Sequence, residues 1–330
     1  MHQSRCLVLI SAVLIGLFSA TSGREIKIQH RESRHRDGNY AFNHTLAEML
    51  VQYSSAVYTS DLSALFTWTC ARCGDKIKDF EMVEVIVDID NCLQKLDNGI
   101  RNWIEDLFWK QLDLDYPGMP GAMVHHGFYT AYQSTVLRPA ILSALQNIKN
   151  IYGNISIIVT GHSMGGALAS FCALDLAVNC GEKDVQLMTF GQPRIGNAVF
   201  ATCFNERIPK AIRLTHQNDI VPHMPPYYSY FPTKTYHHFS REVWLHKEGI
   251  GKDELVEKIC DDSGEDPTCS RSVYGNSISD HLEYYGFELW ADADSTCKIV
   301  VIEVIEEYNI GTGGNIRLSR SPNPTLFLKS

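Results

Sequence analysis

Short apolar runs alternate along the chain with longer stretches in which apolar side chains recur at helical spacing. The short runs end in turn residues, which is typical of strands buried on both faces of a sheet. They lie at 80–89, 155–160, 185–190 and 211–215. Residues 45–59, 100–114 and 128–150 are predicted to be helices, and 236–246 and 298–304 are predicted as further strands. Strands that alternate with helices predict an α/β fold with a largely parallel sheet covered on both faces.

The N-terminal segment has the pattern of a signal peptide. Arg5 precedes an apolar run over 6–18, and small residues follow at 19–23. This order predicts a signal peptide over 1–22 and a single domain over 23–330. The apolar run is too short for a transmembrane anchor, and no later stretch approaches about 18 consecutive apolar residues. We therefore expect no transmembrane anchor.

Compartment and charge narrow the range of partners. A signal peptide leads to the secretory pathway, and we expect an extracellular or vacuole-like destination. The sequons at Asn43 and Asn154 are compatible with glycosylation on that route. The formal charge of −9 argues against nucleic acid and against attraction to anionic lipid, because both partners are themselves negative. Contact with a neutral lipid interface stays compatible with this charge.

Cysteine usage fits an oxidising compartment. Ten cysteines are present, and loss of Cys6 with the signal peptide leaves nine, so at least one stays free or pairs between chains. Cys70 and Cys73 form a C-x-x-C, for which redox chemistry and zinc binding are the alternatives to a disulfide. We favour a disulfide because the motif stands in no βαβ pattern and has no second C-x-x-C. Cys260 and Cys269 flank a loop that a second bridge would close.

A Gly-x-Ser-x-Gly turn centred on Ser163 is the most informative motif. It follows the predicted strand 155–160 and precedes small residues that begin a helix, which is the context of a nucleophile elbow. Gly161 and Gly165 leave room for the tight turn, and the helix points its first amides at a forming oxyanion. The alternative is a glycine-rich turn with a capping serine.

An acid and a base are expected after the serine, in that order. Asp219 follows the predicted strand 211–215 and precedes a proline, where an acid that orients a histidine belongs; an Asx turn is the alternative. His281 follows a loop and precedes an aromatic stretch that we predict to be helical, so it is the candidate general base. Other histidines also follow the serine, and His246 is the strongest competitor among them. These are His216, His223, His237, His238 and His246.

Five blocks in this order resemble the class 3, fungal-type lipases over roughly residues 45–285. They are Ile100-Arg-Asn-Trp103-Ile104-Glu-Asp-Leu107 with Val124-His-His-Gly-Phe128, Gly-His-Ser163-Met-Gly-Gly, Thr189-Phe-Gly-Gln-Pro-Arg194-Ile-Gly-Asn197, Asn218-Asp219-Ile-Val-Pro222 and Asp280-His281-Leu-Glu-Tyr284. The resemblance implies an α/β-hydrolase fold, with a mostly parallel central sheet and helices on both faces. It also implies hydrolysis of acylglycerol-type lipid esters through an acyl-enzyme, without metal or cofactor. It makes Ser163 the nucleophile, Asp219 the acid and His281 the base.

The same resemblance suggests a lid and one oxyanion donor. The Met164 amide is the expected donor. The segment that begins at Ile100 corresponds to a short amphipathic lid helix, with Ile100, Trp103, Ile104 and Leu107 at helical spacing. Such a stripe is compatible with an ordinary core helix, but in a lipase it would close over the site in water and turn toward a lipid surface when open.

One family feature is missing from the chain. Related lipases carry Phe-Arg-Gly-Ser/Thr at the end of a core strand before the lid, and its hydroxyl residue supplies an oxyanion donor. Asp97 stands at that place here, and a strand pair of roughly 20–30 residues is absent. The sheet would lose a buried strand beside the site unless 83–89 takes its place. The alternative function is therefore a catalytically impaired, lipase-like protein that binds lipid or a partner.

Overall fold

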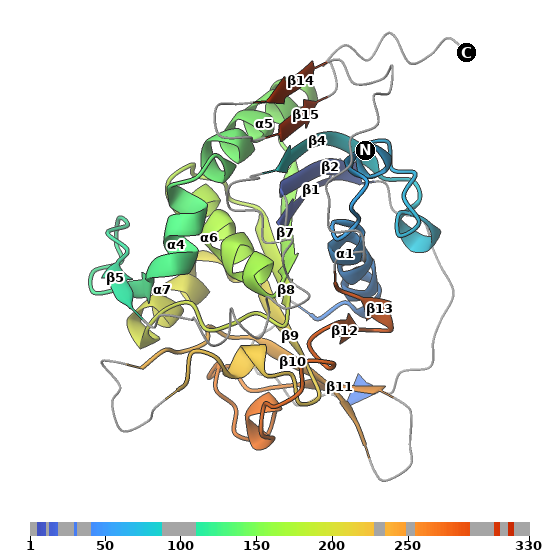
Figure 1. The fold of residues 1–330 in the computed structure, drawn as a ribbon. Helices are drawn as coiled ribbons and strands as arrows, with labels where there is room; N and C mark the ends of the chain where they lie inside the picture. Colours follow the sequence, from blue (N-terminus) through green and yellow to red (C-terminus); the bar gives the residue numbers. More distant parts are fainter. Residues whose placement is uncertain are drawn as a thin grey trace.

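The computed structural model describes residues 5–10, 13–18, 30–31, 41–87, 110–227, 235–248, 255–290, 307–310 and 316–319. Its centre is one large twisted sheet, seen nearly edge-on in Figure 1. In spatial order its strands are β14 (Glu307–Ile310), β15 (Ile316–Ser319), β4 (Glu81–Val87), β2 (Val13–Phe18), β1 (Arg5–Ile10), β7 (Ser156–His162), β8 (Val185–Phe190), β9 (Ala211–His216), β10 (Glu242–Lys247), β11 (Leu255–Ile259) and β3 (His30–Arg31).

The interior of the sheet is parallel. Strands β1, β7, β8, β9 and β10 run in one direction, whereas the β10–β11 pair and the four pairs from β1 out to β14 are antiparallel. The predicted α/β fold with a mostly parallel central sheet is therefore confirmed in the part that carries the functional motifs. The β-branched composition of β7 suits a strand buried on both faces.

Helices cover both faces of this sheet (Figure 1). On one face lie α4 (His126–Gln133), α5 (Leu137–Tyr152), α6 (Met164–Val178) and α7 (Ala198–Arg207); on the other lie α1 (His44–Ala56) and the short α2 (Leu62–Phe66). Side chains of each strand alternate between two cores: Val159 and Leu187 pack among α4–α7, while Ile158 and Met188 pack against α1. None of the helices in the described ranges is long and apolar enough to cross a membrane.

Several predicted elements differ from the observed ones. The stretch 128–150 is not one helix but α4 and α5, because Pro139 in an unbroken helix would clash with the preceding turn. The end of the predicted helix 100–114 is instead β5 (Gln111–Asp113), which pairs with β6 (Met123–His125). Strand β10 begins only at Glu242. Residues 298–304 and most of 100–114 lie outside the described residues.

The predicted aromatic helix after His281 is also wrong. The chain forms a hairpin of β12 (Glu283–Tyr284) and β13 (Phe287–Glu288) there. Its two turn residues, Tyr285 and Gly286, have φ of 53° and 77°, the backbone that a tight two-residue hairpin requires. Tyr284, Tyr285 and Phe287 therefore belong to a β-hairpin and not to one face of a helix.

Both predicted disulfides are present. Cys70 and Cys73 are bridged with a Cα–Cα distance of 5.0 Å, and Cys260 and Cys269 with 6.0 Å. In the described ranges, three 3₁₀ helices lie in the turns between elements: η1 (Asp75–Ile77), η2 (Val221–His223) and η3 (Ser270–Ser272). The C-x-x-C therefore closes a loop after α2, and the second bridge closes the loop between β11 and η3.

The place beside the elbow strand is filled by the N-terminus. Strand β4 is not next to β7: the β1–β2 hairpin lies between them, with β1 parallel to β7 and β2 antiparallel to β4. Strands β1 and β2 therefore occupy the two sheet positions between β7 and β4, where the sequence leads us to expect 83–89 in place of an absent strand. Residues 5–18 are also predicted to leave as part of a signal peptide, and one molecule cannot do both.

We expect a chain that begins at Gly23 to be less stable than the full chain, because its loss of the hairpin leaves the edges of β7 and β4 unpaired. A fall in Tm of several degrees is expected, since each kcal/mol lowers Tm by about 2–4 °C in domains of roughly 150–250 residues, and this chain is somewhat larger. Thermal unfolding with size-exclusion chromatography measures it. Equal Tm for both chains would show that the hairpin contributes nothing to the sheet.

Candidate active site

Ser163 lies on a strained turn between β7 and α6. Its φ of 57° and ψ of −128° belong to a region that L residues rarely adopt, which is the geometry of a nucleophile elbow. The turn is held because the Ser163 amide donates to the Phe190 carbonyl at 2.9 Å. A Cβ at Gly166 would lie 3.2 Å from the Gly161 carbonyl oxygen, so glycine there lets α6 approach the sheet closely.

Asp219 lies just beyond the carboxyl end of β9 and is 2 % exposed. Its Oδ1 accepts from the Val221 amide at 2.9 Å, which is the Asx turn considered as the alternative. Its Oδ2 accepts from His281 Nδ1 at 3.0 Å and from the Tyr284 hydroxyl at 2.7 Å. The Asx turn and the contact with the histidine therefore occur together, one on each oxygen.

His281 links the serine to the acid. Its ring is fully buried, and Nε2 lies 2.8 Å from Ser163 Oγ while Nδ1 lies 3.0 Å from Asp219 Oδ2. With the Nδ1 proton donated to the carboxylate, Nε2 is free to accept from the serine hydroxyl. The three residues predicted as nucleophile, acid and base thus form one continuous hydrogen-bonded row.

The loops that carry Asp219 and His281 are joined to each other. The Asn218 amide donates to Asp280 Oδ2 at 3.0 Å, and the Ser277 amide donates to the Asn218 carbonyl at 2.9 Å. Asp219 and His281 both stand on loops rather than in helices or strands, so these bonds fix the distance between their side chains. Asp280, next to the histidine in sequence, is a tie between the two loops.

Gly191 packs directly against the contact between Asp219 and His281. It follows β8 with a φ of 57°, and a Cβ there would lie 2.8 Å from both Asp219 Oδ2 and His281 Nδ1. Any side chain would push apart the two atoms that share the hydrogen bond. Gly191 and Tyr284 both fall inside the blocks of the family resemblance, but the sequence assigned no role to either, because their roles arise from contacts across the fold.

Tyr284 donates to the acid from a protected position. Its hydroxyl is buried, and burial together with the neighbouring Asp219 charge raises the pKa of Tyr284 well above its ordinary value. The phenol therefore stays protonated and remains a donor to the carboxylate at all ordinary pH values. This third hydrogen bond compensates the buried carboxylate for lost hydration.

The turn after Asp219 is held by a buried ion pair. Arg194 Nη1 donates to the carbonyls of His223 and Pro225 at 2.7 and 3.0 Å, and its Nε and Nη2 donate to Glu265 at 2.7 and 2.8 Å. Burial alone raises the pKa of Glu265, but the Arg194 guanidinium outweighs it and holds that pKa below its usual value. Arg194 thus connects the acid turn to the disulfide-closed loop.

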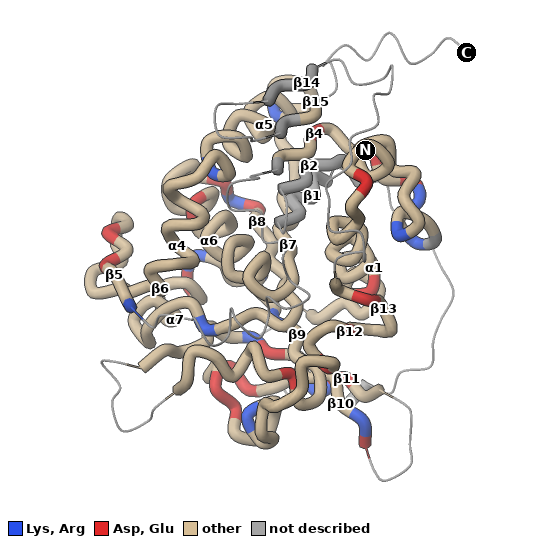
Figure 2. The backbone as a smooth tube through the Cα atoms, in the orientation of Figure 1, with Lys and Arg blue, Asp and Glu red and all other residues tan. Residues whose placement is uncertain are grey.

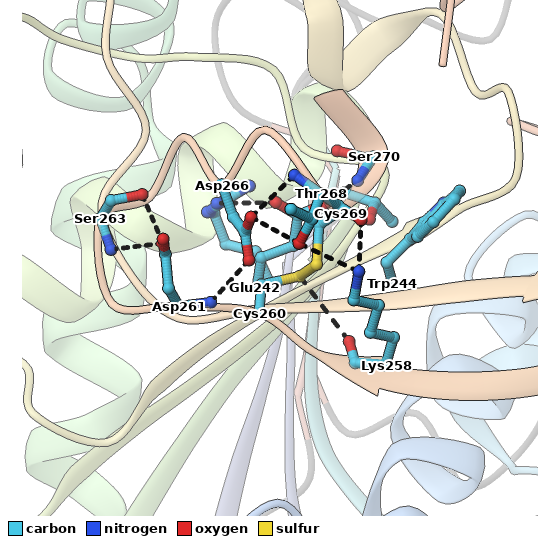
Figure 3. The surroundings of a disulfide bond; sticks show 12 residues. Glu242, Trp244, Lys258, Cys260, Asp261, Ser263, Asp266, Thr268, Cys269 and Ser270 are labelled. Atoms are coloured by element: carbon cyan, nitrogen blue, oxygen red, sulfur yellow. Dashed lines mark hydrogen bonds and ion pairs between the residues drawn. A yellow bond between two sulfur atoms is a disulfide. The ribbon is translucent and has the colours of Figure 1, made fainter. Parts of the chain in front are cut away.

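That loop is ordered from within. Asp266 accepts from the Asp261 amide at 2.9 Å and from the amide and hydroxyl of Thr268, both at 2.8 Å (Figure 3). Cys260, Asp266 and Cys269 lie close enough together to resemble a metal site, but both sulfurs are used by the disulfide. In Figure 2, acidic residues gather around the loops below β9. Ion pairs neutralise part of this negative charge, as Arg194 does for Glu265.

The competing histidines have other partners. His246, the strongest competitor, stacks on Trp244 in β10 with ring centroids 4.1 Å apart. His216 bonds the Asp280 carbonyl, His223 the Asp219 carbonyl and His238 the Pro222 carbonyl. His237 bonds the His238 carbonyl. Among the described histidines, His281 is the one placed to accept from Ser163.

The expected oxyanion donor and the lid are the remaining parts of the predicted site. Met164 begins α6, so its amide belongs to the first turn, where helix amides have no intrahelical partner. Asp97 lies outside the described residues, and so do the predicted lid residues. These are Ile100, Trp103, Ile104 and Leu107.

With this geometry, the chain is similar to fungal lipases. A family profile described as Lipase (class 3) matches residues 93–229. The lipase of Rhizomucor miehei is 32 % identical over 241 residues, which cover 67 % of this chain and 62 % of that protein. The chain belongs to the class 3 lipases. The match to a secreted mono- and diacylglycerol lipase of Fusarium solani, 31 % identical, covers 61 % of this chain and 56 % of that protein.

Solved lipase structures share the fold. The structure of a triacylglycerol lipase whose catalytic centre is described as a serine protease triad has a TM-score of 0.60 and 29 % identity, covering 76 % of this chain and 98 % of that one. The lipase of Rhizopus microsporus var. chinensis has a TM-score of 0.60 and 25 % identity, covering 84 % and 100 %. The chain spans about six tenths of the length of the two curated lipases named above.

In this member of the class 3 lipase family, Gly191→Ala is expected to slow fluorophosphonate labelling of Ser163 on the order of 10²-fold, because displacing a reacting group by about 1 Å has that effect. Gly153→Ala is the matched control: Gly153 also has a positive φ, 72°, but no atom lies within 4 Å of its added Cβ. The control carries the backbone strain without the clash. Equal labelling rates in the two variants would mean that Gly191 does not protect the row.

Proposed function

We propose that the protein is a serine-dependent carboxylic-ester hydrolase acting on acylglycerol-type lipids. The observation that carries the proposal is the buried row in which Ser163 Oγ lies 2.8 Å from His281 Nε2 and His281 Nδ1 lies 3.0 Å from Asp219. A lone elbow serine would be compatible with a structural turn. A serine aligned with a base and an orienting acid has the arrangement that nucleophilic acyl transfer needs.

Acylation begins when His281 Nε2 takes the proton from Ser163 Oγ as the oxygen attacks the ester carbonyl carbon. Asp219 keeps the Nδ1 proton in place and stabilises the imidazolium that forms. The tetrahedral intermediate collapses, the carbon–oxygen bond to the alcohol breaks, and His281 gives its proton to the departing alkoxide. Water then repeats these steps on the acyl-enzyme and releases the fatty acid.

The oxyanion needs donors of its own. The Met164 amide at the start of α6 supplies one, and the helix dipole adds to it. The family's second donor is the hydroxyl residue of Phe-Arg-Gly-Ser/Thr, which this chain lacks. Loss of one donor costs on the order of 10²–10³ in rate, or about 3–4 kcal/mol. This missing block supports a second candidate, a catalytically impaired protein that binds lipid or a partner.

The protein acts on acylglycerols and enters the secretory pathway in this proposal. The names of the relatives, among them a secreted mono- and diacylglycerol lipase, support acylglycerols as the substrate class. The apolar stripe from Ile100 to Leu107 supports a lid that contacts a lipid interface transiently. The signal-like segment 1–22 supports entry into the secretory pathway. Exposed Asn43, whose Oδ1 caps α1 by accepting from Leu46, keeps its side-chain nitrogen available for a glycan.

Ser163→Ala is expected to abolish both fluorophosphonate labelling and hydrolysis of a short-chain p-nitrophenyl ester. Removing the nucleophile of a triad costs on the order of 10⁶-fold in kcat. Ser143→Ala, on the exposed side of α5, is the matched control and should keep both. Turnover retained by Ser163→Ala would overturn the assignment of the nucleophile.

A version with a Phe-Arg-Gly-Thr strand pair restored before Ile100 separates the two candidates. We expect it to hydrolyse the ester on the order of 10²–10³ faster than the natural chain, per serine labelled, because the second oxyanion donor returns. Equal rates would contradict the missing donor and mean that another amide completes the oxyanion hole. If neither version labels, the binding function is favoured instead.

A further inference from the structure

His162 is a buried histidine that the mechanism above does not use. It is the last residue of β7, directly before Ser163, and is 1 % exposed. Its Nε2 lies 2.8 Å from the backbone carbonyl oxygen of His281, and its Nδ1 lies 2.7 Å from the Tyr58 hydroxyl. A histidine with two specific partners, one of them the backbone of the base, calls for a reason beyond core packing.

The partners fix the protonation of this ring. A carbonyl oxygen only accepts, so Nε2 must carry a proton. Burial lowers the pKa of His162 well below its ordinary value, and the neighbouring His281 lowers it further, so the ring is neutral. A neutral ring with a proton on Nε2 has a lone pair on Nδ1, and the Tyr58 hydroxyl must therefore donate to it. Burial keeps the pKa of Tyr58 above its usual value, which preserves this donor.

The two imidazoles also touch. The rings of His162 and His281 have centroids 4.4 Å apart and an angle of 33° between their planes. His281 stands on a loop, and its side chain is anchored at Nδ1 by Asp219. His162 adds a hydrogen bond to the backbone carbonyl of His281, and its ring packs against the His281 ring. The strand that ends in the nucleophile thus also holds the residue that must accept its proton.

We propose that His162 is a positioning residue that sets the Ser163–His281 distance through the His281 carbonyl, with Tyr58 fixing its tautomer. This inference rests on the proposed function, because it concerns the same base. Nothing is transferred to or from His162 during the reaction. Its role is to keep the His281 ring from turning away from Ser163 between the acylation and deacylation steps.

The test compares three variants with the full-length chain. His162→Phe keeps an aromatic ring and removes both hydrogen bonds; His162→Gln restores a donor near the Nε2 position; Tyr58→Phe removes only the tautomer-fixing hydroxyl. Tyr132→Phe is the matched control, because its buried hydroxyl bonds Asp175 Oδ2 at 2.9 Å, away from the row. Each is measured by kcat and KM per fluorophosphonate-labelled serine, and by the downfield ¹H NMR signal of His281 Nδ1–H.

His162→Phe is expected to lower kcat per labelled serine by about 10–100-fold, with KM within about twofold, and to broaden the NMR signal. His162→Gln should recover most of kcat, and Tyr58→Phe should lose about tenfold. Unchanged kcat per labelled serine in His162→Phe, with a signal like that of Tyr132→Phe, would overturn the proposal and leave His162 a core residue. A natural chain that shows the NMR signal but hydrolyses no ester would refute the proposed function alone, since the signal still reports the positioning.

Discussion

The hydrogen bond between Ser163 and His281 is the contact on which the rest of the site depends. It joins residues 118 positions apart in the sequence. Ser163 stands on the turn between β7 and α6, whereas His281 stands on the loop before β12. The parallel strands make it possible, because the carboxyl ends of β7 and β9 open at the same edge of the sheet and deliver the serine and the acid there. The loop that carries the histidine then needs only short ties to the loop after β9 to complete the row.

The sequence predicts the parts of this site that are encoded locally. The elbow around Ser163 and the acid turn at Asp219 each combine a strand, a tight turn and a functional side chain within about ten residues, so spacing alone indicates them. Gly191, Tyr284 and His162 act through contacts with residues far away in the chain. A glycine after a strand, or a tyrosine three residues after a histidine, has no pattern that distinguishes such a role from ordinary packing.

The N-terminal apolar run fits two different structures, and its sequence pattern does not distinguish them. A largely apolar run over 6–18 fits the hydrophobic core of a signal peptide and also two short strands, since both are built mainly from apolar residues. The sheet adds a requirement that sequence periodicity does not show. The facing edges of β7 and β4 carry backbone groups that need hydrogen-bond partners, and two strands fit between them. A strand pair inserted before Ile100 would need the positions that the β1–β2 hairpin fills, so the two segments would exclude each other from the sheet.

The two halves of the site therefore differ in how firmly they are built. On the base side, Asp219 receives three hydrogen bonds, Gly191 keeps the contact with His281 unobstructed, and Arg194 holds the turn that follows. On the oxyanion side, the described residues offer the start of α6. Proton transfer and charge stabilisation contribute separately to the barrier, because one acts at the serine hydroxyl and the other at the carbonyl oxygen. If His281 acts as the base and the second oxyanion donor is absent, Ser163 would be activated normally, and only the poorly stabilised carbonyl oxygen would slow its attack.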